Sequence, residues 1–240
     1  TVEAKVLPTD PSILANGQGA TIVRRVVQDT KDSKLASNFE LRAVKVVDGT
    51  NVYLTPEARY VYVDKGGTGQ VVKVRGDPIG REGHRLPVAR FANDPYPTEG
   101  LTHLAATYDS LTAELRLYIN GAVMASAKFP ALSRPPQSGQ GSRSFVRAGE
   151  NFAGFIDDVR IWSAVRTESE IYNGMDGVDG TASNLVVMYT MDDGGWPAIP
   201  VKGNVKGVLA EYVAPPEANE GDRYLVSAMP TGDWAGHANA

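Results

Sequence analysis

Short runs in which apolar and polar residues alternate follow one another along most of the chain. In AELRLYI (113–119), apolar residues at 115, 117 and 119 alternate with Glu114, Arg116 and Tyr118. This alternation predicts a strand with one face in a core and one in water. Glycine and proline, 25 and 15 of the 240 residues, separate the runs. The pattern is typical of an all-β protein.

Turn residues join several predicted strands into hairpins. Asn120-Gly121 separates 113–119 from 122–129, and Asp48-Gly49 separates 39–47 from 50–55. Both dipeptides supply the positive φ angles that a type I′ turn needs. Since no helical repeat or strand–helix alternation appears, we predict an all-β fold, an antiparallel two-sheet sandwich. Its further strands are expected at 20–28, 58–64, 70–75, 101–109, 154–162, 185–191 and 205–213.

One short helix is predicted after residue 166. Thr167 and Glu170 have the spacing of a capping box, in which each side chain bonds the other residue's backbone. Asn173-Gly174 then supplies a C-terminal signal. We therefore expect a single short helix in an otherwise β structure.

Length and composition narrow the functional classes. A chain of 240 residues can form one large β domain or two small ones. The net charge of −4, with scattered basic residues, gives no general electrostatic attraction to nucleic acid. The absence of cysteine excludes disulfides and thiolate zinc sites. No apolar stretch is long enough for a membrane span, so we expect no membrane insertion.

Two adjacent acids, Asp157 and Asp158, lie within the apolar run of 154–162. In a regular strand neighbouring side chains point to opposite faces, so one acid is expected among apolar neighbours. A buried carboxylate is costly unless hydrogen bonds or a cation satisfy it. The pair is therefore interpreted as a structural anchor or as a calcium ligand. Catalysis is disfavoured, because residues on opposite faces cannot flank one scissile bond.

A bound Ca²⁺ would be the one expected cofactor. Asp157, Asp158 and Asp109 are its candidate ligands, although Ca²⁺ needs several oxygens and no EF-hand-like loop is present. The acidic segments 176–180 and 191–195 could contribute, or could simply be turns.

The central part of the chain resembles the laminin-G/pentraxin-like branch of the concanavalin A-like jelly rolls. The resemblance rests on His103 to Asp109, Leu115 to Gly121, Gly154 to Ile161 and Thr167 to Ile171, in this order and spacing. It implies a two-sheet sandwich that binds glycans, proteins or lipid head groups, often with calcium at one edge. We assign residues 1–213 to this domain, with 76–100 as an insertion.

The end of the chain suggests where the protein works. Residues 214–222 are interpreted as a linker, and 223–240 resemble the start of a module found in bacteriophage tail proteins. The resemblance implies a virion protein whose partners are other virion proteins and copies of itself. We expect a location on the virion surface or outside the cell, and a chain that belongs to something larger.

The functional hypotheses differ in class. The first is a bacteriophage virion structural protein with a lectin-like domain for decoration or for attachment to a host glycan. The alternatives are a bacterial extracellular adhesion or carbohydrate-binding module and a glycan hydrolase of the same fold. We expect no enzyme, because no strand carries the paired acids of the related hydrolases. Sugar rings stack on aromatic side chains, so Tyr96, Trp196 and Tyr53 are the candidate ligand-binding residues.

Overall fold

The computed structural model describes residues 1–28, 35–64, 68–89, 100–130, 143–190, 207–209 and 228–230. For residues 27–28, 35–37, 143–145, 207–209 and 228–230 it describes the backbone alone. Within these ranges no helix is long and apolar enough to cross a bilayer.

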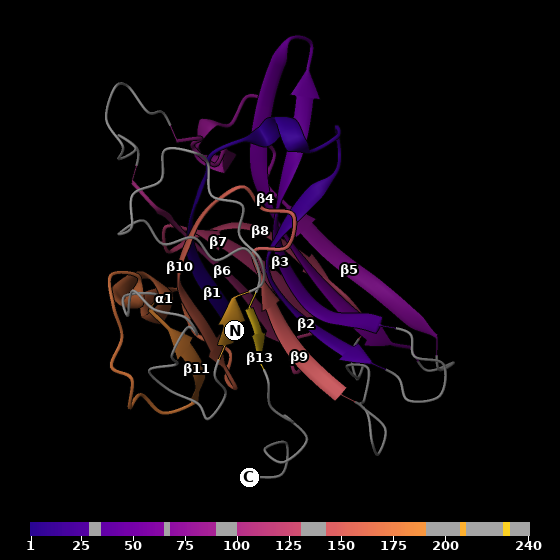
Figure 1. The fold of residues 1–240 in the computed structure, drawn as a ribbon. Coiled ribbons are helices and arrows are strands. Elements are labelled where there is room, and N and C mark those ends of the chain that lie inside the picture. The colour runs from indigo at the N-terminus through magenta and orange to yellow at the C-terminus, as the bar shows by residue number, and fades with distance from the viewer. Residues whose placement is uncertain are drawn as a thin grey trace.

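Two antiparallel sheets face each other and form a sandwich (Figure 1). Sheet A has six strands in the order β11-β10-β1-β6-β7-β8, and sheet B has five in the order β5-β4-β3-β2-β9. The strands of sheet A are β1 (Val2–Pro8), β6 (Thr102–Asp109), β7 (Glu114–Ile119), β8 (Ala122–Lys128), β10 (Gly154–Trp162) and β11 (Leu185–Tyr189). The strands of sheet B are β2 (Gly19–Gln28), β3 (Leu35–Asp48), β4 (Asn51–Val63), β5 (Gly69–Arg75) and β9 (Arg143–Ala148). This architecture confirms the predicted all-β sandwich.

The core lies between the sheets and is built by the alternation that the sequence shows. Val2, Ala4 and Val6 of β1 face it from sheet A, and Leu41 and Ala43 of β3 face it from sheet B. These side chains are almost completely buried, which supplies the main hydrophobic stabilisation of the fold. The sequence pattern did not assign a strand to residues 2–8, although β1 lies in the middle of sheet A between β10 and β6.

The hairpins confirm one turn prediction and correct another. Asn120 and Gly121 both have positive φ angles, 47° and 81°, as predicted for a type I′ turn between β7 and β8. Between β3 and β4, however, Asp48 pairs with Asn51, so the turn residues are Gly49 and Thr50. Only Gly49 has a positive φ, 58°, which is the pattern of a type II′ turn.

The expected short helix is present as α1 (Glu168–Gly174). Thr167 accepts a hydrogen bond from the Glu170 amide, and the Glu170 carboxylate accepts one from the Thr167 amide, so the capping box is confirmed. The helix lies on the outer side of sheet A (Figure 1). There Ile171 packs against Ala105 and Tyr118. Tyr118, which was expected to face water, is therefore 1% exposed.

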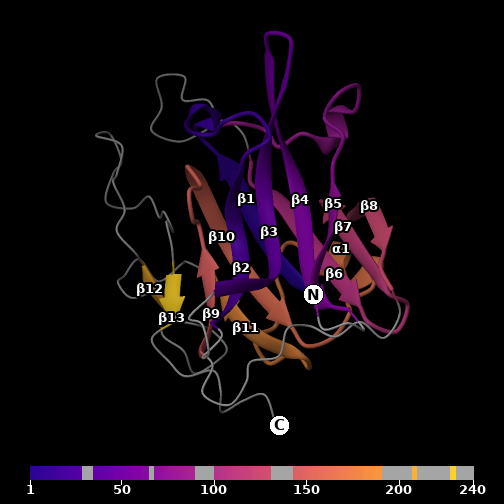
Figure 2. The same cartoon turned by 90° about the vertical axis from the view of Figure 1, so that its right-hand side faces the viewer.

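Short elements complete the described part of the chain. They are the 3₁₀ turns η1 (Pro11–Ile13) and η2 (Glu82–His84), and the strands β12 (Gly207–Leu209) and β13 (Ala228–Pro230). Within the predicted insertion, Leu86 forms a bridge to Leu54 of β4 and is 3% exposed. Strand β12 pairs with β13, which lies against β9 at one side of the sandwich (Figure 2).

Candidate functional site

The two adjacent acids lie at a bulge in β10. Glu3 pairs with Arg160 while Lys5 pairs with Asp157, so Asp158 and Val159 together oppose the single residue Ala4. Asp158 has a φ of 50°, a left-handed conformation that Asp adopts more readily than most residues. The extra residue breaks the alternation of β10. The prediction that Asp157 and Asp158 point to opposite faces is therefore wrong for a physical reason, the bulge.

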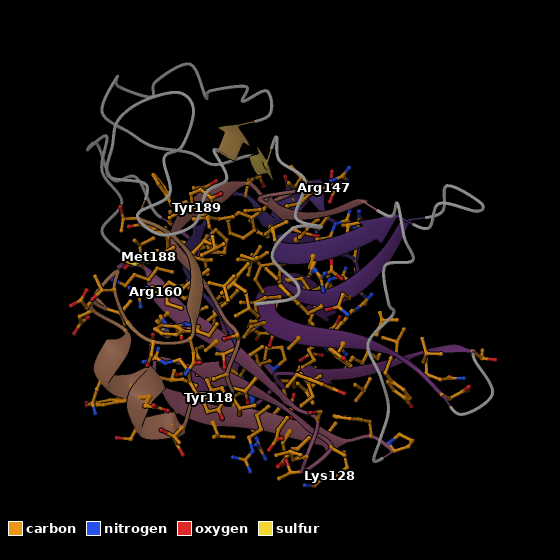
Figure 3. The ribbon with its side chains drawn as sticks, turned by 90° about the horizontal axis from the view of Figure 1, so that it is seen from below. Tyr118, Lys128, Arg147, Arg160, Met188 and Tyr189 are labelled. Carbon is orange, nitrogen blue, oxygen red and sulfur yellow. The ribbon has the colours of Figure 1, made fainter. Side chains whose placement is uncertain are left out.

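Asp158 anchors a network of charges on the outer side of sheet A. Its Oδ2 lies 2.8 Å from Arg160 Nη2 and 2.9 Å from Lys5 Nζ. Arg160 is fully buried, and its Nη1 donates to the Gly174 carbonyl oxygen of α1 at 2.7 Å. Figure 3 shows Arg160 on the side of sheet A where α1 lies. These contacts agree with the structural-anchor interpretation.

A second carboxylate in the same network is fully buried. Glu3 Oε1 accepts a hydrogen bond from Arg166 Nη1 at 2.7 Å. Arg160 Nη1 lies 3.6 Å from Glu3 Oε2, too far for a hydrogen bond but close enough for charge attraction, and His103 Nε2 lies 3.7 Å from the same oxygen. Burial alone would raise the pKa of Glu3, but His103 and Arg166 outweigh it and hold the pKa below its usual value.

The three predicted calcium ligands do not come together. Lys5 pairs with both Asp157 and His103, so Asp157 is level with His103 across the sheet. Asp109 lies six residues further along β6, roughly 20 Å away at about 3.3 Å per residue. There it accepts hydrogen bonds from Leu111 and Thr112 in its own turn. Among the described residues no three His, Cys, Asp or Glu side chains form a group that could hold a metal ion. Calcium binding elsewhere stays a prediction.

Of the three aromatic candidates, Tyr53 lies within the described residues. Tyr53 lies on β4 near its hairpin turn, and the guanidinium of Arg85 covers its ring at 4.3 Å. Tyr96 and Trp196 lie outside the described residues. The structure therefore gives no site built from these three residues.

A pocket of about 300 Å³ opens at one end of the sandwich, where both sheets contribute. Its walls come from β1, β3, β4, β6, β7 and β10. Four aromatic residues line it, namely Phe39, Tyr60, Tyr108 and Trp162. The polar residues around it are Thr1, Asn38, Glu40, Arg59, Thr107, Ser110 and Ser163. Its volume is at the lower end of the range for small-molecule sites.

The aromatic wall of this pocket is held in place by stacking. The Tyr108 ring lies between the rings of Tyr60 and Phe129, with centroid separations of 3.4 Å and 4.7 Å. Burial raises the pKa of the Tyr60 hydroxyl far above its usual value, and the neighbouring Tyr108 adds to the shift. Both hydroxyls therefore remain protonated at neutral pH and can donate hydrogen bonds.

A buried N–H donor of a residue that lines the pocket has no hydrogen-bond partner among the described residues. It is Asn38 Nδ2, and Asn38 is 5% exposed. Leaving a buried donor unpaired costs about 1–3 kcal/mol, so such groups usually meet a ligand or a water molecule. Trp162 also lines the pocket, but its ring packs against Leu185, Met188 and the Arg166 guanidinium. The pocket thus offers apolar ring faces together with a donor that needs an acceptor.

Sequence reasoning missed this site. Trp162 was interpreted as structural, and Asn38, Tyr60 and Tyr108 lie on three different strands. The one local signal is the aromatic residue in the Thr-Tyr-Asp sequence at 107–109, which places Tyr108 at the end of β6. The convergence of the others depends on how the two sheets pair and pack, and single-strand patterns do not contain this information.

Comparisons with known proteins agree with the fold. A family model described as "Concanavalin A-like lectin/glucanases superfamily" matches residues 37–172, more than half of the chain. No curated protein sequence matches significantly.

Three solved structures are similar at low identity. A Bacteroides ovatus ATCC 8483 protein to which carbohydrate binding is ascribed has a TM-score of 0.43 and 18% identity, over 96% of this chain and 55% of that one. The chain thus spans about half the length of that protein. The sialidase module CBM40 of Ruminococcus gnavus has a TM-score of 0.46 and 14% identity, over 72% of this chain and 81% of that one. A heptameric SAP-like pentraxin from Limulus polyphemus has a TM-score of 0.42 and 11% identity, over 74% of this chain and 70% of that one.

At these values the likeness to the solved structures is a distant one. The family match is the stronger finding, since it covers both predicted hairpins, strand β10 and most of α1. The chain belongs to the concanavalin A-like lectin/glucanase superfamily.

Proposed function

We propose that this chain is a carbohydrate-binding domain without catalytic activity, and that the pocket at the end of the sandwich holds one sugar residue. The observation that carries the proposal is the buried, unpartnered donor Asn38 Nδ2 of a residue that lines an aromatic-lined pocket of the described structure. Sugar hydroxyl and ring oxygens are acceptors that would satisfy this donor.

The pocket suits a sugar better than a wholly apolar ligand. A pyranose has apolar C–H faces, which pack on aromatic rings, and an equatorial rim of hydroxyl groups. Phe39 and Tyr108 supply ring surface, while Thr107, Ser110 and Ser163 supply hydroxyls. A volume of about 300 Å³ favours one ring over a longer oligosaccharide.

A binding role is favoured over hydrolysis by the acids around the pocket. Glycoside hydrolysis commonly needs two carboxylates on either side of the scissile bond. Among the described residues that line the pocket, Glu40 is the one acid. It accepts a hydrogen bond from Thr21 Oγ1 at 2.7 Å and lies 3.9 Å from Arg42 Nη1. These contacts favour a structural role for Glu40 over that of a general acid.

The biological setting is a separate part of the proposal. The tail-protein resemblance of residues 223–240 supports a virion surface component that engages a host glycan together with other virion proteins and further copies of itself. Antibodies against the chain should then label the outside of phage particles. Label confined to bacterial cell surfaces would favour the adhesion module instead.

A glycan array probed with the purified chain, in calcium and in chelator, tests the binding function. We expect binding to a defined set of glycans in both conditions, because the pocket needs no metal ion to supply its donors. Binding that disappears in chelator would show that a calcium site outside the three proposed ligands is essential. No binding in either condition would contradict the proposed function and favour a structural decoration.

A further inference from the structure

Basic side chains form a continuous row across the outer face of sheet B. Cross-strand pairing places Lys73 opposite Arg59, Arg59 opposite Glu40, Glu40 opposite Arg24, and Arg24 opposite Arg147. All five strands contribute, and four of the five residues are cations. Figure 2 looks onto this sheet, with β3 and β4 toward the viewer, and Figure 3 shows Arg147 on the side away from sheet A.

A second row runs beside the first. Arg75 lies opposite Glu57, Glu57 opposite Arg42, and Arg42 opposite Thr21. Arg42 Nη1 lies 3.9 Å from Glu40 and 3.8 Å from Glu57, so it bridges the two rows. Gly19 makes room for this bridge, because a Cβ at that position would overlap the Arg42 guanidinium.

The charges of this face do not balance. The two rows contain six cations and two carboxylates. Glu150, which pairs with Arg24 and Arg147, adds a third carboxylate. Six minus three leaves an excess of three positive charges on a face of a chain whose net charge is −4. Like charges directly opposite one another in a sheet are destabilising. Glu150 offsets this for Arg24 and Arg147, whereas Lys73 and Arg59 share no such carboxylate among the described residues.

The excess charge is concentrated at the β4–β5 side of the sheet. Lys73 and Arg75 are both exposed and lie two residues apart on the same face of β5. Arg59, one third exposed, is oriented beside them by a 2.6 Å ion pair with the buried Glu57. Three cationic heads thus project from neighbouring positions that are fixed by the sheet. Arg59 also lines the pocket at the end of the sandwich, so the cationic face adjoins it.

We propose that Lys73, Arg75 and Arg59 form a binding site for an acidic saccharide on the outer face of sheet B. The carboxylate or sulfate groups of such a ligand would pair with guanidinium groups in a bidentate manner and with the Lys73 ammonium as a point charge. The choice of a saccharide rests on the proposed function, whereas the anion site rests on the cation rows alone.

A short acidic saccharide fits this site better than nucleic acid does. Nucleic-acid binding draws on many phosphate contacts and usually on a basic domain, whereas this chain has a sequence pI of about 5.4. The accessible part of the face offers three cations within two strands. Three cations can pair with the two or three acidic groups that a short chain of acidic sugars carries.

Calorimetric titration of the whole chain with a galacturonic acid hexamer tests the proposal. The comparison ligands are a neutral galactose hexamer, a sulfated galactan oligomer and a single-stranded DNA oligonucleotide. The test variant is Lys73→Ala/Arg75→Ala, and the matched control is Arg81→Ala/Lys128→Ala, which removes two exposed positive charges elsewhere. Neither double variant touches the core, and thermal melting checks that both fold.

We expect the acidic hexamer to bind in a salt-dependent manner, with the test variant weakened at least about tenfold and the control unchanged. The sulfated ligand shows whether the site takes sulfate as well as carboxylate. Binding that is weakened equally in both variants, or that is not weakened in the test variant, would overturn the proposal. The cations of the edge strand β5 would then only discourage this edge from pairing with other strands. DNA binding as tight as the hexamer's would overturn the assignment to saccharides.

The pocket variant Ser110→Trp separates this result from the proposed function. It fills the mouth of the pocket and leaves unchanged Lys73 and Arg75, which do not line the pocket. If the Ser110→Trp variant still binds the acidic hexamer and the Lys73→Ala/Arg75→Ala variant does not, the ligand binds on the outer face of sheet B. Loss in Ser110→Trp alone would assign acidic ligands to the pocket and overturn the separate site.

Discussion

Asp158 and Arg160, two residues apart on β10, form a 2.8 Å ion pair on the outer side of sheet A because a bulge turns Asp158 toward that side. Arg160 in turn holds α1 through the carbonyl of Gly174. The pair thus links the bulge of a central strand to the helix that covers the sheet. It gives the acid within this apolar run a structural role.

Replacing Asp158 tests this link. Asp158→Asn keeps a residue that tolerates positive φ but removes the charge that faces buried Arg160 and Lys5. We expect unfolding free energy to fall by about 2–3 kcal/mol, because an arginine is left buried with one fewer partner. Urea denaturation measures the loss. The matched control is Glu114→Gln, which breaks surface ion pairs to Arg116 and Lys128 and should change stability little.

Acid should destabilise the fold through Glu3. Its pKa is held below the usual 4.5 in the folded chain, so its carboxylate stabilises the fold fully above that pH. As pH falls below 4.5 toward the lower folded pKa, the unfolded state takes up the proton first and this stability is lost. Urea denaturation across this range should show the decline. Glu3→Gln should be less stable at neutral pH and should show a shallower dependence on pH, and an unchanged slope would contradict the assignment.

The capping box can be removed without touching the core. Thr167→Ala deletes the acceptor of the Glu170 amide and should cost about 1 kcal/mol. Amide hydrogen exchange within α1 should accelerate, and Tyr118, which the helix covers, should become more accessible. Thr167→Ser keeps the hydroxyl and should behave like the unchanged chain. Equal exchange in all three proteins would show that α1 is held by its packing alone.

The β7–β8 hairpin should be sensitive to any side chain at Gly121. A Cβ there would lie 2.8 Å from Tyr172 of α1, and the residue also has a φ of 81°. Gly49→Ala is the matched control, because it has positive φ but nothing within 4 Å of the added Cβ. Both variants should lose about 1 kcal/mol from backbone strain. Gly121→Ala should lose clearly more, and equal losses would show that α1 yields to the contact.

The sequence patterns succeeded where structure is local. The Asn120-Gly121 turn and the Thr167–Glu170 capping box each depend on a few adjacent residues, and both are confirmed. The alternation of Val2, Ala4 and Val6 was also a usable strand signal, although β1 was not predicted from it. The strand pattern predicted the sandwich, which the two sheets confirm, and the family resemblance is confirmed by the family match.

The patterns failed where one residue changes register or where distant strands meet. The bulge at Asp158 reverses the side to which later residues of β10 point, and an Asp within a strand was its only sequence signal. The pocket combines Asn38, Tyr108 and Trp162 from strands of both sheets. No local pattern specifies that such residues share one cavity.

The measurement that tests the central claim most directly is a titration of two tryptophan variants with the neutral glycan that the chain binds best. Ser110 is exposed and lines the pocket, whereas its neighbour Leu111 is 92% exposed and does not line it. We predict that Ser110→Trp lowers affinity at least about tenfold, since the indole occupies the sugar position, and that Leu111→Trp binds as the unchanged chain does. Undiminished binding by a folded Ser110→Trp variant would show that the pocket is not the sugar site.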